Sequence, residues 1–510
     1  MQLEQFKYLL ADPLVAVRHG QGKATGAGEV LSREADWLPG WAWKAVAGGR
    51  TVLLAAWLGL LACGCQTYQE QNRVIRYWQN GDVVNAVQEA QSKAHKNARN
   101  KDAIIWRLEE GAVLRAAGRY QDSNLAFDQA QSKMDEYAQK AKVRVGQEAA
   151  AMLSNQANLA YEGRAYDGIM LNTYEALNYL ALGQPDKARP ELIRAYQRQQ
   201  DAVEANKKRI QEAQEAAANS KDSAAIAKAE QDPGLQARLA GVTTNLTGMQ
   251  SYADYVNPFT VYLDGLYFMA NAADASDGER ARKSLERVAE FAPENPFVKQ
   301  DLATVGEVMA GKPLAPVTYV VFETGCAPVR DQIRIDIPII ISKVSYLGAA
   351  FPTLRFEDDY MPFLTVSGGG ANVSTIRVAS MDAVVAQDFK NELPTIITKT
   401  IIATVAKGVA AYAANDAAQQ SGGDLGGLLA QLGTAVYQMA VNIADERTWS
   451  TLPKEFQVAR LPTPADRTID LMTPAGVKVR VTMGEGTVNV VYVKSINPNA
   501  PLMVSQFKLK

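Results

Sequence analysis

The stretch NYLALGQPDKARPELIRAY, residues 178–196, decides how the first half of the chain folds. Together with the residues just before it, it sets small and large apolar residues at the offsets of two packed helices: Ala176, Gly183, Ala188, Leu192 and Ala195. In such a hairpin the small residues let the helices approach, and the large residue fills the gap between them. We therefore expect a helical hairpin here.

The same offsets occur earlier in the chain, where Gly111 and Gly118 are followed by Phe127 and Ala130 in QDSNLAFDQAQ. Weaker copies lie in NGDVVNAVQEA and GERARKSLERVAEFAPENP. The offsets are those of the tetratricopeptide pattern, but the copies do not recur at its steady interval of about 34 residues. We therefore predict a tetratricopeptide-like helical domain over 66–312, and an irregular helical bundle is the alternative.

A helical arm is predicted over 190–240. Residues 190–216 are rich in strong helix formers and contain no glycine, so one helix should extend beyond the repeat. Residues 219–223 break it, and the chain should then run back. The arm is either a partner-binding element or a solvated hairpin.

The residue composition of the sequence changes at Pro313, where runs of strand length that are rich in β-branched residues begin. Strands are expected at VTYVVFE, QIRIDIPII, FLTVSG, STIRVASM, FQVAR, TIDLM, VKVRVTM and VNVVYVK. Two helices should separate STIRVASM from FQVAR: one carrying a stripe from Ile397 to Tyr412, and one over 425–443. Strands, then helices, then strands predict an α+β domain over 313–510 with a mostly antiparallel sheet.

A secretory leader is indicated by RTVLLAAWLGLLACGCQ, residues 50–66. A basic residue opens it, and its apolar run is too short to cross a bilayer as a helix. The ending resembles the lipobox of bacterial lipoproteins, in which a cysteine thiol receives a diacylglycerol, the leader is cut before that cysteine, and the new amine is acylated. Cys63 and Cys65 both fit that position. We therefore assign residues 1–65, which include both cysteines, to the leader region. The acidic residues before it fit a leader badly, and the true start is expected near Val46.

Composition excludes several classes of function. The formal charge is −2 and no long basic run occurs, so we expect no nucleic-acid partner. After the leader the chain contains one histidine, His95, and one cysteine, Cys326. The sequence therefore has no cysteine and histidine spacing typical of a metal site, and no catalytic triad built on histidine is expected. Residues 306–312 spell most of a phosphate loop, but Pro313 stands where a hydroxyl is needed for magnesium. We therefore expect no nucleotide, no cofactor, no metal and no catalytic residue.

Four longer motifs carry a resemblance to a known family: NTYEALNYLALGQPDKARPELIRAYQRQ (172–199), FETGCAPVRDQIRIDIPI (322–339), MDAVVAQDFKNELPTIITKTI (381–401) and RTWSTLPKEFQVARLPTPAD (447–466). With these motifs the chain resembles a family of uncharacterised bacterial lipoproteins over nearly all of its mature length. The resemblance implies an anchored envelope protein with a helical repeat front. It implies no activity and no catalytic residues.

Taken together, these observations predict a scaffold anchored by its N-terminal lipid to the periplasmic face of the outer membrane and binding an unidentified envelope protein. The alternative is an envelope hydrolase or glycan-binding module built on carboxylates of the C-terminal domain: Glu323, Asp331, Asp336, Asp358 and Asp359. A cleft uniting these with Tyr346, Phe351 and Tyr360 would favour that alternative. A third possibility is a membrane-active helix over 395–414, although packing of this helix on the sheet is the stronger expectation.

Overall fold

The computed structural model describes residues 72–143, 156–246, 249, 252–253, 255–341, 344–409 and 443–510. Contacts divide the chain into Met1–Gly64 and a compact unit, Cys65–Lys510, to which all described residues belong. The predicted lipidation sites Cys63 and Cys65 and the predicted start near Val46 lie outside the described residues, as does most of the helix predicted over 425–443.

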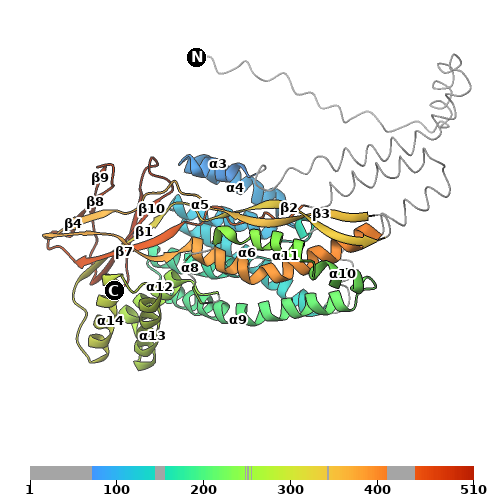
Figure 1. Cartoon of the computed structure of the whole chain (residues 1–510). Coiled ribbons are helices and arrows are strands. Elements are labelled where there is room, and N and C mark those ends of the chain that lie inside the picture. Colours follow the sequence, from blue (N-terminus) through green and yellow to red (C-terminus); the bar gives the residue numbers. More distant parts are fainter. Residues whose placement is uncertain are drawn as a thin grey trace, which may run out of the picture. The chain divides into compact units, whose positions relative to one another are not determined.

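The first half of the described chain is helical (Figure 1). Its helices are α3 (Arg73–Gln79), α4 (Val83–Asn97), α5 (Ala103–Ala116), α6 (Tyr120–Val143), α8 (Ala165–Ala181), α9 (Pro185–Ala218), α10 (Ser223–Glu230), α11 (Pro233–Gly241), α12 (Pro258–Asn271), α13 (Ala275–Phe291) and α14 (Pro296–Met309). Several start at an Asp or Asn whose side chain accepts hydrogen bonds from first-turn N–H groups, for example Asn257 and Asn295. In both of these cases a proline follows at the first helical position, where its missing N–H is not needed.

The two predicted helical hairpins are present as the pairs α5–α6 and α8–α9. The residues predicted to pack between their helices are fully buried: Phe127, Ala130, Ala176, Ala188, Leu192 and Ala195. A Cβ atom at Gly111 would lie 2.3 Å from the Phe127 ring, so Gly111 is the point of closest approach between α5 and α6. Gly118 and Gly183 play a different part from the one predicted. Each has positive φ, and a Cβ atom added to either would have no atom within 4 Å, so each ends a helix instead of admitting a neighbour.

Substitution of Gly111 by alanine (Gly111→Ala) should lower the free energy of unfolding by about 1–3 kcal/mol, because the added methyl group would overlap the buried Phe127 ring. Gly306→Ala is the matched control. Gly306 lies inside α14 with no atom within 4 Å of the added Cβ, so alanine there should stabilise by up to about 1 kcal/mol. Urea unfolding followed by far-ultraviolet circular dichroism measures both, and equal effects of the two substitutions would contradict the assigned role of Gly111.

The predicted arm begins with one long helix, since α9 runs for 34 residues to Ala218 and is followed by Asn219 as its C-cap. The return differs from a single helix because Asp232 and Pro233 divide it into α10 and α11, with Pro233 starting the second. Ile226 and Leu235 are buried, and both return helices contact strand β2. The return segment is therefore held between a helix and a sheet.

The second half contains strands and a long helix. Its strands are β1 (Val317–Thr324), β2 (Val329–Ile341), β3 (Val344–Arg355), β4 (Thr365–Gly368), β5 (Ala371–Ser374), β6 (Ile376–Ser380), β7 (Glu455–Pro462), β8 (Thr468–Met472), β9 (Lys478–Thr482), β10 (Val488–Ser495) and β11 (Met503–Lys508). They form a five-stranded sheet in the order β11-β10-β1-β7-β6, the hairpin β2–β3 and a four-stranded sheet in the order β5-β4-β8-β9. All pairings among the described strands are antiparallel except that of β1 with β10. The predicted α+β class with mostly antiparallel sheets is confirmed.

A helix over 381–409 follows β6. Ile401 and Val405 of the predicted apolar stripe are buried. The helix lies beside α9 and α10, since Asn206 donates to the Asn391 carbonyl and Thr398 donates to Glu230. In its described part the stripe is therefore covered by protein.

Asp382, in the first turn of this helix, does not cap it. The Ser380 hydroxyl oxygen accepts from the Ala383 N–H at 3.2 Å, which makes Ser380 the capping residue. The Asp382 carboxylate instead accepts from Lys454 Nζ at 2.5 Å.

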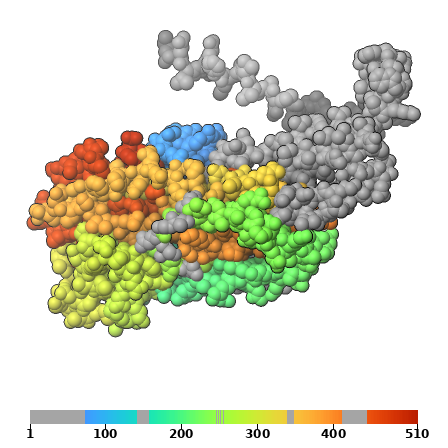
Figure 2. Space-filling view, viewed as in Figure 1, coloured from blue at the N-terminus to red at the C-terminus, as the bar shows by residue number. Residues whose placement is uncertain are grey.

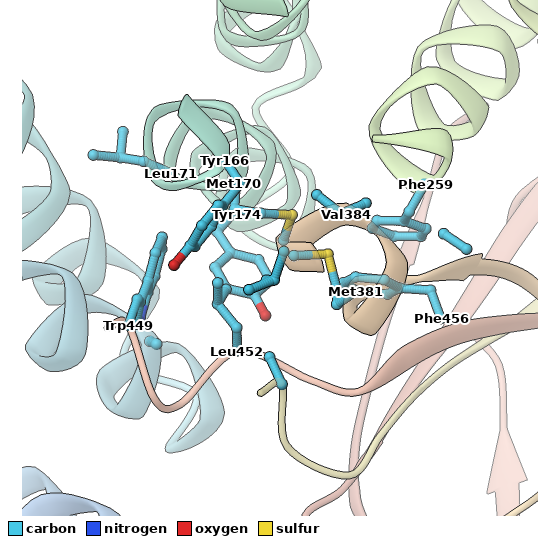
Figure 3. Close-up of a cluster of buried hydrophobic side chains, with 14 of the residues drawn as sticks. Tyr166, Met170, Leu171, Tyr174, Phe259, Met381, Val384, Trp449, Leu452 and Phe456 are labelled. Carbon is cyan, nitrogen blue, oxygen red and sulfur yellow. The ribbon is translucent and has the colours of Figure 1, made fainter. Parts of the chain in front are cut away.

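The helical half and the α+β half share one core. Trp449, from the loop before β7, lies against Phe127 and Tyr174 with ring centroids 5.8 and 5.9 Å away, and Figure 3 shows Tyr174 of α8 facing Trp449 across this cluster. Phe259 of α12 stacks on Phe456 of β7 at 3.8 Å. The space-filling view shows strand residues directly on the helices of residues 275–310, which agrees with the contacts of α13 with β6 and α14 with β7 (Figure 2).

Candidate functional site

A buried arginine on α5 lies at the junction of the two halves. Arg115 comes four residues after Gly111, so the two residues share the helix face that packs inward. Its side chain is 8% exposed, and its guanidinium lies 4.7 Å from the Tyr492 ring, 5.3 Å from Tyr174 and 5.9 Å from Tyr120. Aromatic faces attract a cation at such distances, and the attraction is stronger where water is excluded.

A chain of hydrogen bonds fixes Arg115 in place. Arg115 Nη1 donates to Asn178 Oδ1 at 2.7 Å, and Asn178 Nδ2 donates to Ser123 Oγ at 2.9 Å. The Ser123 hydroxyl donates in turn to the Gly111 carbonyl at 2.7 Å. The chain joins α5, α8 and α6, so the packing of the two hairpins sets the position of the guanidinium.

The sheet supplies the other charged groups. Glu323 of β1 stands opposite Lys494 in the parallel ladder, and Tyr492 lies two residues before Lys494 and therefore on the same face of β10. The Glu323 carboxylate accepts from Tyr174 Oη at 2.8 Å and Tyr492 Oη at 2.5 Å, and it forms an ion pair with Lys494. Burial alone would raise the pKa of Glu323, but the nearby Lys494 and Arg115 charges lower it below its ordinary value, so Glu323 is ionised.

These groups line an open pocket of about 280 Å³ between α5 and the edge of the five-stranded sheet. The wall is completed by Ala112, Ala116, Ala117, Gly118, Met503, Val504 and Ser505. Among the described residues no carboxylate lies within ion-pair distance of Arg115, while the charges of Glu323 and Lys494 cancel each other. The lining therefore carries one net positive charge on a guanidinium, the group best suited to hold a small anion.

The carboxylates predicted to form a hydrolytic cleft do not come together. Of the five, Glu323 is buried in the pocket, whereas Asp331, Asp336, Asp358 and Asp359 are exposed. Asp358 forms an ion pair with Lys454 at 3.4 Å. Of the aromatic residues expected beside them, Phe351 is fully buried, and the side chain of Tyr346 lies outside the described part of the structure.

The other residues considered for a functional role make structural contacts. Residues 306–312 end α14, and Lys312 pairs with Glu307. Arg447 forms a local ion pair with Asp445 at 2.7 Å in the loop before β7, and it also pairs with Asp102 at 2.9 Å. Cys326 is buried, and burial raises the pKa of its thiol to about 12, so it is an unreactive core residue.

Within the described ranges, no group of three or more His, Cys, Asp and Glu side chains is placed to hold a metal ion. Among the helices of those ranges, none has both the length and the apolar character needed to cross a membrane.

Of the charged and aromatic residues in the pocket, only Glu323 was singled out from the sequence. One signal was present for Arg115, because it is spaced like Gly111 on an apolar helix face, where an arginine needs a buried partner. Nothing in the sequence indicated that Tyr492 and Lys494 line a pocket, since the residue pattern along a strand does not specify which helix covers it.

No protein-family model matches the sequence, and neither a curated protein nor a solved structure matches it at a significant level. The contacts described above are therefore the basis on which the pocket is assigned.

Proposed function

We propose that this protein is a lipid-anchored, non-catalytic scaffold on the periplasmic face of the outer membrane, where it binds a partner protein of the cell envelope. The observation that carries the anchor is the leader over 50–66, with Cys63 and Cys65 at the cleavage position. Several acyl chains on one cysteine give stable anchoring, whereas a single chain would be marginal.

Partner binding is supported by the helical front and the pocket. We propose that the pairs α5–α6 and α8–α9 are degenerate tetratricopeptide-like units, because buried small residues mark the close contact in each pair. Stacked helical pairs commonly offer a binding surface to another protein. The pocket beside Arg115 lies where these pairs meet the sheet, so one partner could contact both halves of the protein.

A non-catalytic role is supported by the distribution of acidic groups. Asp331, Asp336, Asp358 and Asp359 are exposed, whereas Glu323 is buried. Glu323 is itself ion-paired with Lys494 and accepts hydrogen bonds from two tyrosine hydroxyls, so it serves as a structural acceptor.

The anchor is tested by replacing both cysteines with serine (Cys63→Ser and Cys65→Ser). We expect the double variant to move from the membrane pellet to the supernatant of a cell lysate and to keep an uncut leader, because no thiol remains to receive the diacylglycerol that precedes cleavage. Each single variant is the control, and the one that behaves like the double variant identifies the acylated cysteine. Unchanged sedimentation of the double variant would overturn the proposed anchor.

A further inference from the structure

We infer that the pocket beside Arg115 binds one carboxylate group of the partner polypeptide; this inference rests on the proposed role in partner binding. The relevant observations are the charge, geometry and walls of the pocket.

The charge of the pocket selects a monoanion. Its lining carries two cations, Arg115 and Lys494, and one anion, Glu323, so a single negative charge neutralises it. Lys494 and Glu323 are already paired with each other, and Lys494 also lies 4.8 Å above the Trp78 ring. A carboxylate monoanion therefore matches the charge available, whereas a phosphate dianion would leave one charge in excess.

The geometry of Arg115 favours a planar ligand group. Its guanidinium is held between aromatic rings and by one hydrogen bond to Asn178, which restricts its orientation before any ligand arrives. A planar fork of N–H donors matches a carboxylate in two parallel hydrogen bonds. Because the arginine is already ordered, binding loses little side-chain entropy.

The pocket walls indicate what accompanies the carboxylate. Ala112, Ala116 and Val504 present small apolar surfaces beside the charged group. The volume of about 280 Å³ is at or below the lower limit of pockets that enclose whole small molecules. The pocket therefore suits the end of a chain, namely a carboxylate next to a small aliphatic side chain.

The test uses the purified full-length protein in detergent and two probes, the peptide acetyl-Ala-Ala-Ala with a free C-terminal carboxylate and the same peptide with a C-terminal amide. Isothermal titration should detect binding of the carboxylate and at least tenfold weaker binding of the amide. Inorganic phosphate should compete poorly. Equal binding of both peptides, no binding of the carboxylate, or stronger binding of phosphate would overturn the inference.

Variants identify the site. Arg115→Gln should weaken carboxylate binding at least tenfold, and Arg115→Lys should restore only part of it because the planar fork is lost. Arg119→Gln is the matched control, since Arg119 lies on the surface in an ion pair with Asp122 and should leave binding within twofold. Should Arg115→Gln fail to fold, Ala116→Leu provides a second test, because the larger side chain fills the pocket without touching the hydrogen bonds of Arg115. Unchanged binding in Ala116→Leu would remove the pocket as the site.

These measurements separate the two proposals. Loss of membrane sedimentation in the double cysteine variant tests the anchor and does not depend on the pocket. If the protein is anchored but does not bind the carboxylate peptide, the proposed anchor is still supported and only the carboxylate assignment is overturned.

Discussion

Replacement of Glu392 by glutamine (Glu392→Gln) is expected to lower the free energy of unfolding by about 3–5 kcal/mol. The carboxylate accepts from Arg164 Nη1 at 2.7 Å and from Arg330 Nη2 at 2.6 Å, and both arginine side chains are largely buried. These three residues come from the helix over 381–409, the start of α8 and strand β2. A neutral amide would leave both cations in the interior without the negative charge that they share. Urea unfolding at pH 7 measures the loss.

The matched control is Asp388→Asn, four residues earlier on the same helix. Neither carboxyl oxygen of Asp388 has a hydrogen-bond partner among the described residues, and burial raises the pKa of Asp388 well above its ordinary value. Burial therefore favours the neutral form of Asp388 in the folded protein, and asparagine places a neutral side chain there. We expect Asp388→Asn to be at least as stable as the unsubstituted protein at pH 7, so a large loss of stability would contradict this assignment.

The stability effects of the two substitutions should depend on pH in different ranges. For Glu392, burial alone would raise the pKa, but Arg164, Arg330 and Arg209 outweigh it and lower the pKa to about 2. Its contribution to stability is present above the ordinary carboxyl pKa and is lost as the pH falls toward 2. For Asp388 the pKa is raised, so its contribution is present below the ordinary carboxyl pKa and is lost as the pH rises. Between about pH 5 and pH 7 the advantage of Asp388→Asn should grow, whereas the deficit of Glu392→Gln should persist. Unfolding curves at both pH values test this.

Elements with a strong local pattern could be predicted from the sequence. TIDLM is strand β8 with the predicted bounds, and α9 ends at the break predicted for it. Strand β3 was missed because Gly348, Ala349 and Pro352 interrupt any alternation in it, and its partner β2 supplies the ladder. The helix over 381–409 begins before the predicted stripe, which starts at Ile397, and it continues through Pro394.

The candidate pocket could not be predicted because its residues are brought together by long-range pairing. The only parallel pairing among the described strands joins Glu323 to Lys494, which are 171 residues apart. No local periodicity specifies that ladder, since β1 and β10 are both entirely buried runs. The helical hairpins were easier to predict because a hairpin such as α5–α6 packs two helices that follow each other in the sequence. Its small residues therefore indicate the contact directly, as Gly111 and Phe127 do.

The second large effect is expected from Glu109→Ala, in the middle of α5. The buried Glu109 carboxylate accepts hydrogen bonds from the Ser450 N–H at 2.8 Å, the Ser450 hydroxyl at 2.5 Å, the Thr451 N–H at 3.3 Å and the Thr451 hydroxyl at 2.6 Å. Alanine would remove the acceptor of four donors in a buried loop, and each buried donor left unpaired costs about 1–3 kcal/mol. We expect a loss of at least about 3 kcal/mol.

The same substitution should release the loop over 443–454, which carries Trp449 into the shared core. Arg447 is 4% exposed, so trypsin should not cut after it in the unsubstituted protein. In Glu109→Ala a fragment beginning at Thr448 should appear early in digestion, because the loop opens more readily than the helices around it. Glu110→Gln is the matched control, since this neighbouring glutamate pairs with Arg107 on its own helix and does not contact the loop in any described hydrogen bond. If both variants kept the cleavage pattern and unfolding midpoint of the unsubstituted protein, Glu109 would not be what holds the loop over 443–454 in place. A new cut after Arg447 in Glu109→Ala alone would show that this carboxylate holds the loop against α5.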